Sequence, residues 1–408
     1  MITPWLVETV RHLRGRGVDV QVLAPSYRGL TSQDVDGVRV HRFRYAPRRW
    51  EALTHEETAP DRVRHRPLYL AEVPGYALAG AAAAARLARR EAIDVVHVHW
   101  PVPHALMGWA ARWASGAPLV CTFHGVELTW ARKTPVMMPF LKRTIRTADA
   151  VTANSSYTER LIRAVYDRPV ERIPFGAAIE PPAAPALAPE PSNAPLPSSG
   201  ERPEAESRSG ERPPRVGREA GDRFELLFVG RLVERKGVHY LLDALARLRD
   251  DARVHLRVVG DGPMRPALEA RAAQLGIDDR VIFEGLLSGD VLRRRFAECD
   301  AFVLPAVVDA KGDVEGLGVV LIEALSYERP VIASAAGGIV DIVRDGDTGL
   351  LVPPGDAAAL AHAIVRYVED PRLAAALAAR GRAHVEREFS WPVITERLVT
   401  LYERLRAR

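Results

Sequence analysis

Short apolar runs alternate with amphipathic stretches along most of the chain. Runs at 93–99, 119–123 and 150–153 are each followed by a segment whose apolar residues recur every three or four positions, and the alternation resumes at Phe224. Near-continuous apolar runs are typical of strands buried on both faces of a parallel sheet, and the segments between them are typical of helices. The pattern therefore predicts an α/β protein with parallel sheets.

The alternation is interrupted once, by residues 177–222. This segment contains ten prolines with many Ala, Ser, Glu and Arg, and it has no apolar period. Because such a composition cannot form a packed core, we expect a disordered and extended linker. The predicted organisation is an N-terminal domain over 1–176, a second domain over 223–390 and a terminal helix over 391–408, and 408 residues suffice for two cores.

Composition indicates a soluble, cytoplasmic protein. Hydrophobic residues make up 47% of the chain and charged residues 26%, which is ordinary for a globular protein. The two cysteines, Cys121 and Cys299, provide no disulfide framework and no CxxC motif. The N-terminal segment lacks the apolar core of a secretory signal, and the alanine-rich stretch 76–88 is too short and weakly apolar to span a membrane.

Positive charge is concentrated in the first half of the chain. Residues 1–176 carry 25 Lys and Arg against 16 Asp and Glu, whereas residues 177–408 carry 31 against 36. A basic N-terminal domain could meet anionic lipid at the inner membrane face, or a phosphorylated acceptor. The alternative is a solvated arginine-rich surface, and we expect no nucleic-acid partner.

Two carboxylates mark the stretch GDVEGLGVVLIEALSYER, residues 312–329. Glu315 stands just before a predicted helix, and Glu323 lies on nearly the same side because eight residues make about 2.2 turns. Gly316 and Gly318 allow a ligand close to the helix start, where free N–H groups favour anionic oxygens. A carboxylate suits two adjacent sugar hydroxyls. Taken alone, however, such a pair is more commonly a helix cap and a solvated glutamate.

Cations and glycines follow the first two strands of the second domain. In FELLFVGRLVERKG, Arg231 and Lys236 occupy a strand-to-helix turn that begins at Gly230, which predicts a cradle for a diphosphate. The next strand ends in Gly260, Asp261 and a second glycine. This GxG is weak evidence for dinucleotide binding because the third glycine is absent.

These motifs together resemble family 4 of the retaining glycosyltransferases. The resemblance rests on Glu-x7-Glu in EGLGVVLIEAL, on GRLVERKG, on ASAAGGIVDIVRDGDTGLLVPPGD and on HGVEL at 124–128. It implies the GT-B architecture, two Rossmann-like doubly wound domains facing a central cleft. It also implies a metal-independent hexosyltransferase that moves a sugar from a UDP-, GDP- or ADP-sugar to a hydroxyl acceptor, lipid-linked in some members, without a cofactor.

The resemblance assigns a role to each matching residue. Arg231 and Lys236 would neutralise the leaving diphosphate, Glu323 would hold the ribose, and Glu315 would hold the sugar and phosphate. His124 would contact the sugar from the opposite domain. The leaving phosphate oxygen can accept the proton of the acceptor hydroxyl, so no protein base is required. Further donor-binding positions are Gly230, Gly260, Asp261, Gly316, Leu317 and Gly318, and no residue is assigned to a metal.

The chain departs from the family pattern at its start. The family opens with a strand and a glycine-rich acceptor loop, whereas here the helix that follows them already begins near Val7. We therefore expect the first strand to be absent from this sequence and the sheet interior to be exposed. A second departure is Leu317, which stands where the family frequently has an aromatic residue, so packing against the donor sugar is in question.

Several local features admit other interpretations. His97, His99 and His104 could form a zinc site, but core or cleft histidines fit better because no carboxylate or thiol accompanies them. Glu127 either lines the acceptor pocket or is an acid at a helix start.

Two other functions remain alternatives. A nicotinamide-dependent enzyme would need a complete GxGxxG. A non-catalytic or truncated nucleotide-sugar binder fits the missing strand but not the retention of all four charged residues.

Deleting most of residues 177–222 should leave donor affinity nearly unchanged. The predicted donor-binding residues lie beyond the segment, and loop-closure free energy changes by only about 0.6 kcal/mol per doubling of length. Nucleotide titration of the shortened chain measures the effect, with the full chain as control. A folded variant that no longer binds nucleotide would show that the segment belongs to the site.

Overall fold

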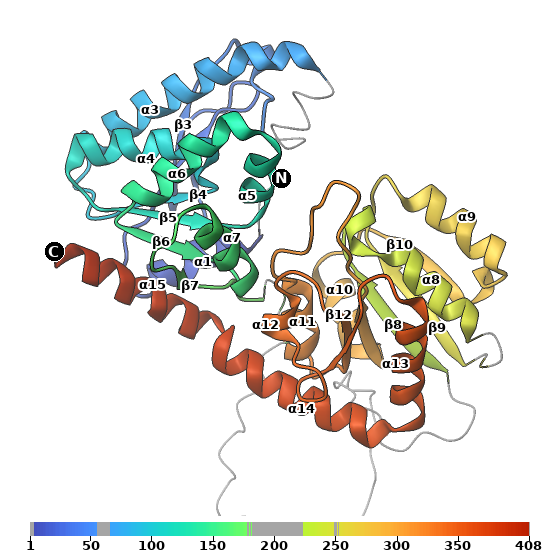
Figure 1. Cartoon of the computed structure of the whole chain (residues 1–408). Helices are drawn as coiled ribbons and strands as arrows, with labels where there is room; N and C mark the ends of the chain where they lie inside the picture. The colour runs from blue at the N-terminus through green and yellow to red at the C-terminus, as the bar shows by residue number, and fades with distance from the viewer. Residues whose placement is uncertain are drawn as a thin grey trace, which may run out of the picture.

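The computed structural model describes residues 4–54, 66–177, 179, 181, 223–248, 251 and 253–407. It shows two α/β lobes joined along one side by a pair of C-terminal helices (Figure 1). Most of the predicted linker lies outside the described residues, as does part of the loop before α3. The prediction of two Rossmann-like domains with parallel sheets is confirmed.

The C-terminal lobe holds one six-stranded parallel sheet in the order β10-β9-β8-β11-β12-β13. Strand order reverses between β8 and β11, and parallel α/β sheets bind ligands beyond the carboxyl ends of the strands at such a point. The strands are β8 Phe224–Val229, β9 Val254–Val259, β10 Val281–Gly285, β11 Ala301–Leu304, β12 Val331–Ser334 and β13 Leu350–Val352.

Helices and short 3-10 turns connect these strands and cover both faces of the sheet. They are η4 Glu234–Lys236, α8 Val238–Arg247, α9 Arg265–Leu275, η5 Asp278–Arg280, α10 Gly289–Glu298, α11 Val319–Ser326, α12 Ile339–Ile342, α13 Ala357–Glu369 and α14 Pro371–Glu388. The apolar runs of the sequence form the core between them, and the side chains of β11 and β12 are buried throughout.

The N-terminal lobe contains two separate sheets. One has the order β1-β3-β2, in which β1 and β3 are parallel and β2 is antiparallel; the other is the parallel sheet β4-β5-β6-β7. The strands are β1 Gln21–Pro25, β2 Gln33–Val35, β3 Val38–Phe43, β4 Val96–His99, β5 Leu119–Phe123, β6 Ala150–Ala153 and β7 Glu171–Arg172. The short strand β2 is not predicted by the apolar pattern because all three of its residues are exposed.

The helices of this lobe cover both faces of its sheets. They are α1 Pro4–Gly15, α3 Glu72–Arg90, α4 Pro101–Ser115, α5 Val126–Lys133, α6 Met138–Thr147 and α7 Ser156–Val165, with 3-10 turns η1 Arg48–Trp50, η2 Pro67–Ala71 and η3 Pro135–Met137. The side chain of Ser155 caps α7 by accepting the N–H of Thr158. No helix in the described part of the chain has the length and apolar character of a bilayer-crossing segment.

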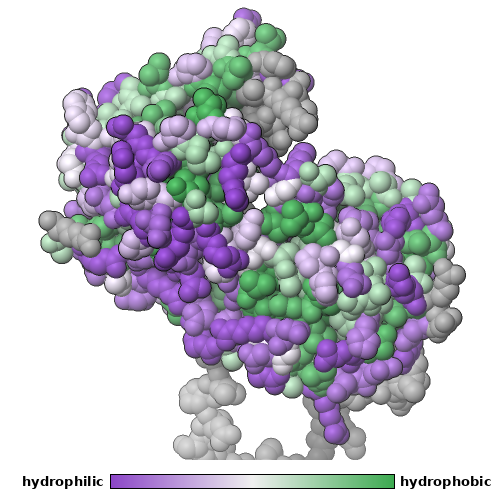
Figure 2. All heavy atoms as spheres, in the orientation of Figure 1, coloured by the Kyte–Doolittle hydropathy of each residue, from purple (hydrophilic) through white to green (hydrophobic). Residues whose placement is uncertain are grey.

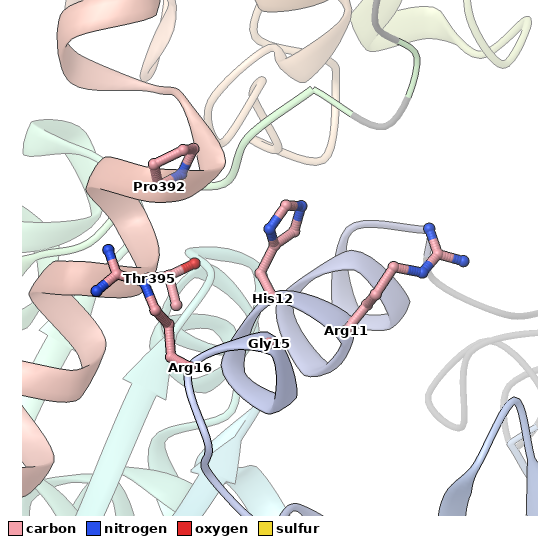
Figure 3. A pocket seen from close by; sticks show the side chains of 6 residues that line it. All are labelled: Arg11, His12, Gly15, Arg16, Pro392 and Thr395. Atoms are coloured by element: carbon pink, nitrogen blue, oxygen red, sulfur yellow. The ribbon is translucent and has the colours of Figure 1, made fainter.

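Helix α15, Trp391–Arg406, returns to the N-terminal lobe and packs against α1 (Figure 1). The indole N–H of Trp391 donates to the carbonyl of Ala177 at 2.7 Å. The hydroxyl of Tyr402 is 2.6 Å from Nδ1 of His97, a residue of β4. A shallow pocket between α1 and α15 is lined by Arg11, His12, Gly15, Arg16, Pro392 and Thr395 (Figure 3). No predicted site residue lines this pocket.

Candidate active site in the interdomain cleft

The predicted diphosphate cradle is the loop between β8 and α8. Arg231 is exposed in this loop, and Lys236, at the end of η4, is buried. The turn that follows β9 requires glycine at Gly260. Its φ is +132°, and a Cβ there would lie 1.9 Å from the carbonyl oxygen of Gly230. The GDG turn therefore packs tightly on the cradle, which explains its glycine without a dinucleotide; Asp261 is exposed beside it.

The centre of the candidate site is an ion pair between Lys236 and Glu315. Their Nζ and Oε2 atoms are 2.7 Å apart, with side-chain exposures of 11% and 13%. Burial alone would raise the pKa of Glu315, but the charges of Lys236 and Arg235 and a hydrogen bond from the N–H of Gly318 outweigh it, so the pKa is lowered. Glu315 is therefore an ionised carboxylate held at the start of α11.

Helix α11 presents the second carboxylate. Glu323 is buried on this helix, about one and a half turns beyond its N-cap Gly318. The side chain of Leu317 is also buried and belongs to the core of the lobe, so only its backbone is available to a donor. The effect of Leu317 on packing against the donor sugar stays a prediction.

His124 follows β5 and lies among aromatic rings. Its ring is stacked on Trp100 at 4.4 Å and on Phe175 at 5.3 Å, and Trp5 of α1 is 5.1 Å away. Its Nε2 lies 3.3 Å from Nδ1 of His99. The sequence pattern around 124 does not indicate this environment, because the surrounding residues come from three other segments of the chain.

Burial and mutual repulsion keep these imidazoles neutral. Desolvation, followed by the charges of His99 and His97, lowers the pKa of His124 well below 6.5, and burial lowers the pKa of His99 to about 4. His97 contacts the hydroxyls of Tyr402 and Thr122, so it is a core residue, one of the two predicted alternatives. Within the described residues, no group of three His, Cys, Asp or Glu side chains is placed to hold a metal.

Glu127 supports the position of His124. Its Oε1 accepts the backbone N–H of His124 at 2.7 Å, as an acid in a first helical turn does. Its other oxygen, Oε2, is buried without a partner among the described residues, and burial raises the pKa of Glu127 to about 7. The Oε1 contact fits the interpretation of Glu127 as an acid at a helix start. Because Oε2 has no partner among the described residues, the interpretation that Glu127 lines the acceptor pocket also stays open.

The two lobes meet in front of α11. A Cβ on Gly316 would lie 3.0 Å from the carbonyl oxygen of His124, so the two halves of the predicted site face each other. Figure 2 shows a hollow between the lobes on this side of the molecule. Lys133 and Asp313 form an ion pair of 3.1 Å across the cleft, and Asp341 accepts the N–H of Ser156 at 2.5 Å at the start of α7.

Sequence reasoning missed Arg235 and these interdomain partners. Arg235 lies in η4 directly before Lys236. The nearby basic residues Arg231 and Lys236 were the sequence signal that could have identified it. Nothing in the sequence links Asp341 to Ser156, because the two residues are 185 positions apart.

Comparison with known proteins places the chain among glycosyltransferases. Residues 211–384 match the model described as "Glycosyl transferases group 1", and residues 5–180 match "Glycosyltransferase Family 4". The GDP-mannose-dependent alpha-(1-6)-phosphatidylinositol monomannoside mannosyltransferase of Mycolicibacterium smegmatis is 33% identical over 89% of this chain and 91% of the relative. The N-acetyl-alpha-D-glucosaminyl L-malate synthase of Bacillus anthracis is 26% identical over 81% and 79%.

Solved structures share the fold. Sucrose-phosphate synthase from Thermosynechococcus elongatus superposes with a TM-score of 0.72 at 24% identity, covering 99% of this chain and 93% of that one. HepE of Anabaena, solved with UDP and glucose, gives a TM-score of 0.65 at 19% identity over 98% and 95%. Fold and sequence together define a GT-B glycosyltransferase that uses a nucleotide-sugar donor. Within that class, the chain belongs to glycosyltransferase family 4.

Replacing Lys236 by Met should destabilise the C-terminal lobe by about 3–5 kcal/mol at neutral pH, because Glu315 would become an uncompensated buried charge. The pKa of Glu315 would then lie above its unfolded value, so the variant should be least destabilised at low pH and should lose stability as pH rises through the folded pKa. Unfolding of the wild type and the variant between pH 5 and 8 measures this effect.

The matched control is the double variant Lys236→Met/Glu315→Gln, which removes both charges and should recover much of the stability at neutral pH. A loss that is independent of pH and is not recovered in the double variant would contradict the role of the ion pair.

Proposed function

We propose that the chain transfers a hexosyl group from a nucleotide-diphosphate sugar to a hydroxyl acceptor with retention of anomeric configuration. The observation that carries the proposal is the Lys236–Glu315 pair at the start of α11, which faces neutral His124 across the cleft. Cations and helix N–H groups at this position suit a diphosphate, while a carboxylate and an imidazole suit sugar hydroxyls.

In this proposal the cleft acts through position and charge. Arg231 and Lys236 stabilise the negative charge that grows on the diphosphate as the bond from the anomeric carbon to the phosphate oxygen breaks. The acceptor oxygen bonds to that carbon from the same face, and its proton passes to the departing phosphate oxygen. Glu323 holds the ribose and Glu315 the sugar. Fixed cations take the part that a divalent ion has elsewhere, so the proposed reaction needs no metal.

The proposed donor is GDP-mannose, with UDP- and ADP-sugars as alternatives. The printed name of the Mycolicibacterium smegmatis relative specifies GDP-mannose, and its 33% identity extends over 89% of this chain. Its name also specifies phosphatidylinositol monomannoside, which supports a lipid-linked hydroxyl acceptor here.

Exposed apolar side chains on the N-terminal lobe support a lipid-linked acceptor. Leu68 and Leu70 of η2 are 90% and 61% exposed, and Leu78 of α3 is 72% exposed. The guanidinium of Arg89 on α3 lies over the ring of Trp113, which is exposed on α4. In Figure 2, apolar and polar residues are interspersed over the part of the lobe that contains α3. We therefore propose peripheral contact of a cytoplasmic enzyme with an anionic membrane through this lobe.

Identification of donor and product tests the proposal. Thermal unfolding should be shifted upward by GDP or UDP and not by NAD. With GDP-mannose and vesicles that contain phosphatidylinositol monomannoside, the NMR spectrum of the product should show the new sugar α-linked, as it is in the donor. Turnover should persist in EDTA. A β-linked product would contradict retention, and loss of turnover in EDTA restored by Mg²⁺ or Mn²⁺ would contradict metal independence.

Arg231 and Glu323 should differ in their kinetic effects. Arg231→Ala should lower kcat by about 10²–10³, because the contact strengthens with the charge of the transition state. Glu323→Gln should mainly raise the donor KM, because ribose contacts are equal in the ground and transition states. Arg294→Ala, on an exposed position of α10, is the matched control. An unaltered donor KM in Glu323→Gln would remove the ribose role.

A further inference from the structure

His99 and His124 lie side by side at the carboxyl ends of two neighbouring strands. His99 is the last residue of β4, and His124 directly follows β5, which pairs with β4 in parallel. Nδ1 of His99 is 3.3 Å from Nε2 of His124, and the ring centroids are 5.4 Å apart. The two imidazoles are therefore hydrogen-bonded to each other.

Neighbouring side chains hold both rings in place. The ring of His99 stacks on that of His97 at 4.4 Å, and two hydroxyls contact the nitrogens of His97 in turn. The ring of His124 stacks on that of Trp100, also at 4.4 Å. Because these contacts oppose rotation of either ring, the main freedom that remains to the pair is the position of the proton between them.

Only one proton lies between the two facing nitrogens. Burial lowers the pKa of His99 to about 4 and that of His124 well below 6.5, so both rings are neutral at pH 7. A neutral imidazole has one N–H donor and one acceptor nitrogen. If Nδ1 of His99 donates, Nε2 of His124 accepts, and the proton of His124 lies on its Nδ1. In the opposite arrangement, both rings carry their proton on Nε2. The two histidines therefore have the same tautomer.

The second nitrogen of His124 is available to a ligand. Its Nδ1 has no hydrogen-bond partner among the described residues, and the lobes meet beside this residue, near Gly316. On the other lobe, the ionised carboxylate of Glu315 can only accept hydrogen bonds. A sugar hydroxyl held between the two groups donates to Glu315, so it must accept from Nδ1 of His124.

We propose that His99 is a positioning residue for the donor sugar, because it determines the tautomer of His124. With the donor bound, His99 donates from Nδ1 to Nε2 of His124, and His124 donates from Nδ1 to a sugar hydroxyl. The inference rests on the proposed function for the identity of the ligand, whereas the matching tautomers are a property of the chain alone.

Nitrogen-15 NMR of the imidazole rings tests the pair without any measurement of turnover. The signals of the pair are those that disappear in His99→Asn and in His124→Asn. In the chain alone at pH 7, both rings should have the same tautomer, and with GDP-mannose in excess both should carry the proton on Nδ1. Different tautomers in either state, or protons on Nε2 with the donor bound, would overturn the proposal. Absence of donor binding would instead contradict the proposed function, and the spectrum of the chain alone would still decide whether the tautomers match.

Turnover of two His99 variants separates a positioning role from a structural one. His99→Phe keeps an aromatic ring for packing and removes the N–H donor, so kcat/KM for the donor should fall about two- to tenfold, the range for one neutral hydrogen bond. His99→Asn places an amide N–H near the position of Nδ1 and should restore most of this loss. The matched control is His362→Phe, at an exposed position of α13, which should leave turnover unchanged.

Wild-type turnover in His99→Phe, or an equal loss in both His99 variants, would show that the N–H of His99 has no positioning role. If His99→Phe does not fold, the tautomers measured in the wild-type chain decide the question.

Discussion

The ion pair between Lys236 and Glu315 is the interaction on which the candidate site depends. It joins the loop after β8 to the loop before α11, and so it holds together the two sides of the point where strand order reverses. A pair this buried contributes little net stability, but losing either partner leaves a costly charge. Arg231 and Arg235 keep the loop net positive despite Glu315, so the proposed diphosphate still meets an excess of positive charge.

The position of the opposite lobe depends on the terminal helix more than on the contacts across the cleft. Lys133 and Asp313 are both partly exposed, and exposed ion pairs contribute only about 0–1 kcal/mol. Helix α15, in contrast, buries Trp391 and Leu401 in the core of the N-terminal lobe. The weak contacts can break and re-form while α15 keeps the lobes together, which is what a cleft that admits and releases a donor requires.

Much of the fold could be predicted from the sequence, because buried parallel strands appear as apolar runs that need no partner to be recognised. The spacing of the motif Glu-x7-Glu likewise predicts Glu315 just before a helix and Glu323 on nearly the same side of that helix. Partners could not be predicted where they depend on distant segments. Examples are the pairing of Lys236 with Glu315 and the rings around His124.

The two lobes present groups of different charge to the cleft, and the surroundings of each buried group determine whether it is ionised. In the C-terminal lobe, burial is offset by neighbouring cations, so the pKa of Glu315 is lowered and the carboxylate remains ionised. In the N-terminal lobe, burial and the neighbouring His99 and His97 lower the pKa of His124, so the imidazole is neutral. A neutral imidazole offers one donor and one acceptor and adds no charge next to a diphosphate. In the proposed mechanism, the C-terminal lobe therefore supplies the charged groups, and the N-terminal lobe adds a neutral group beside the sugar.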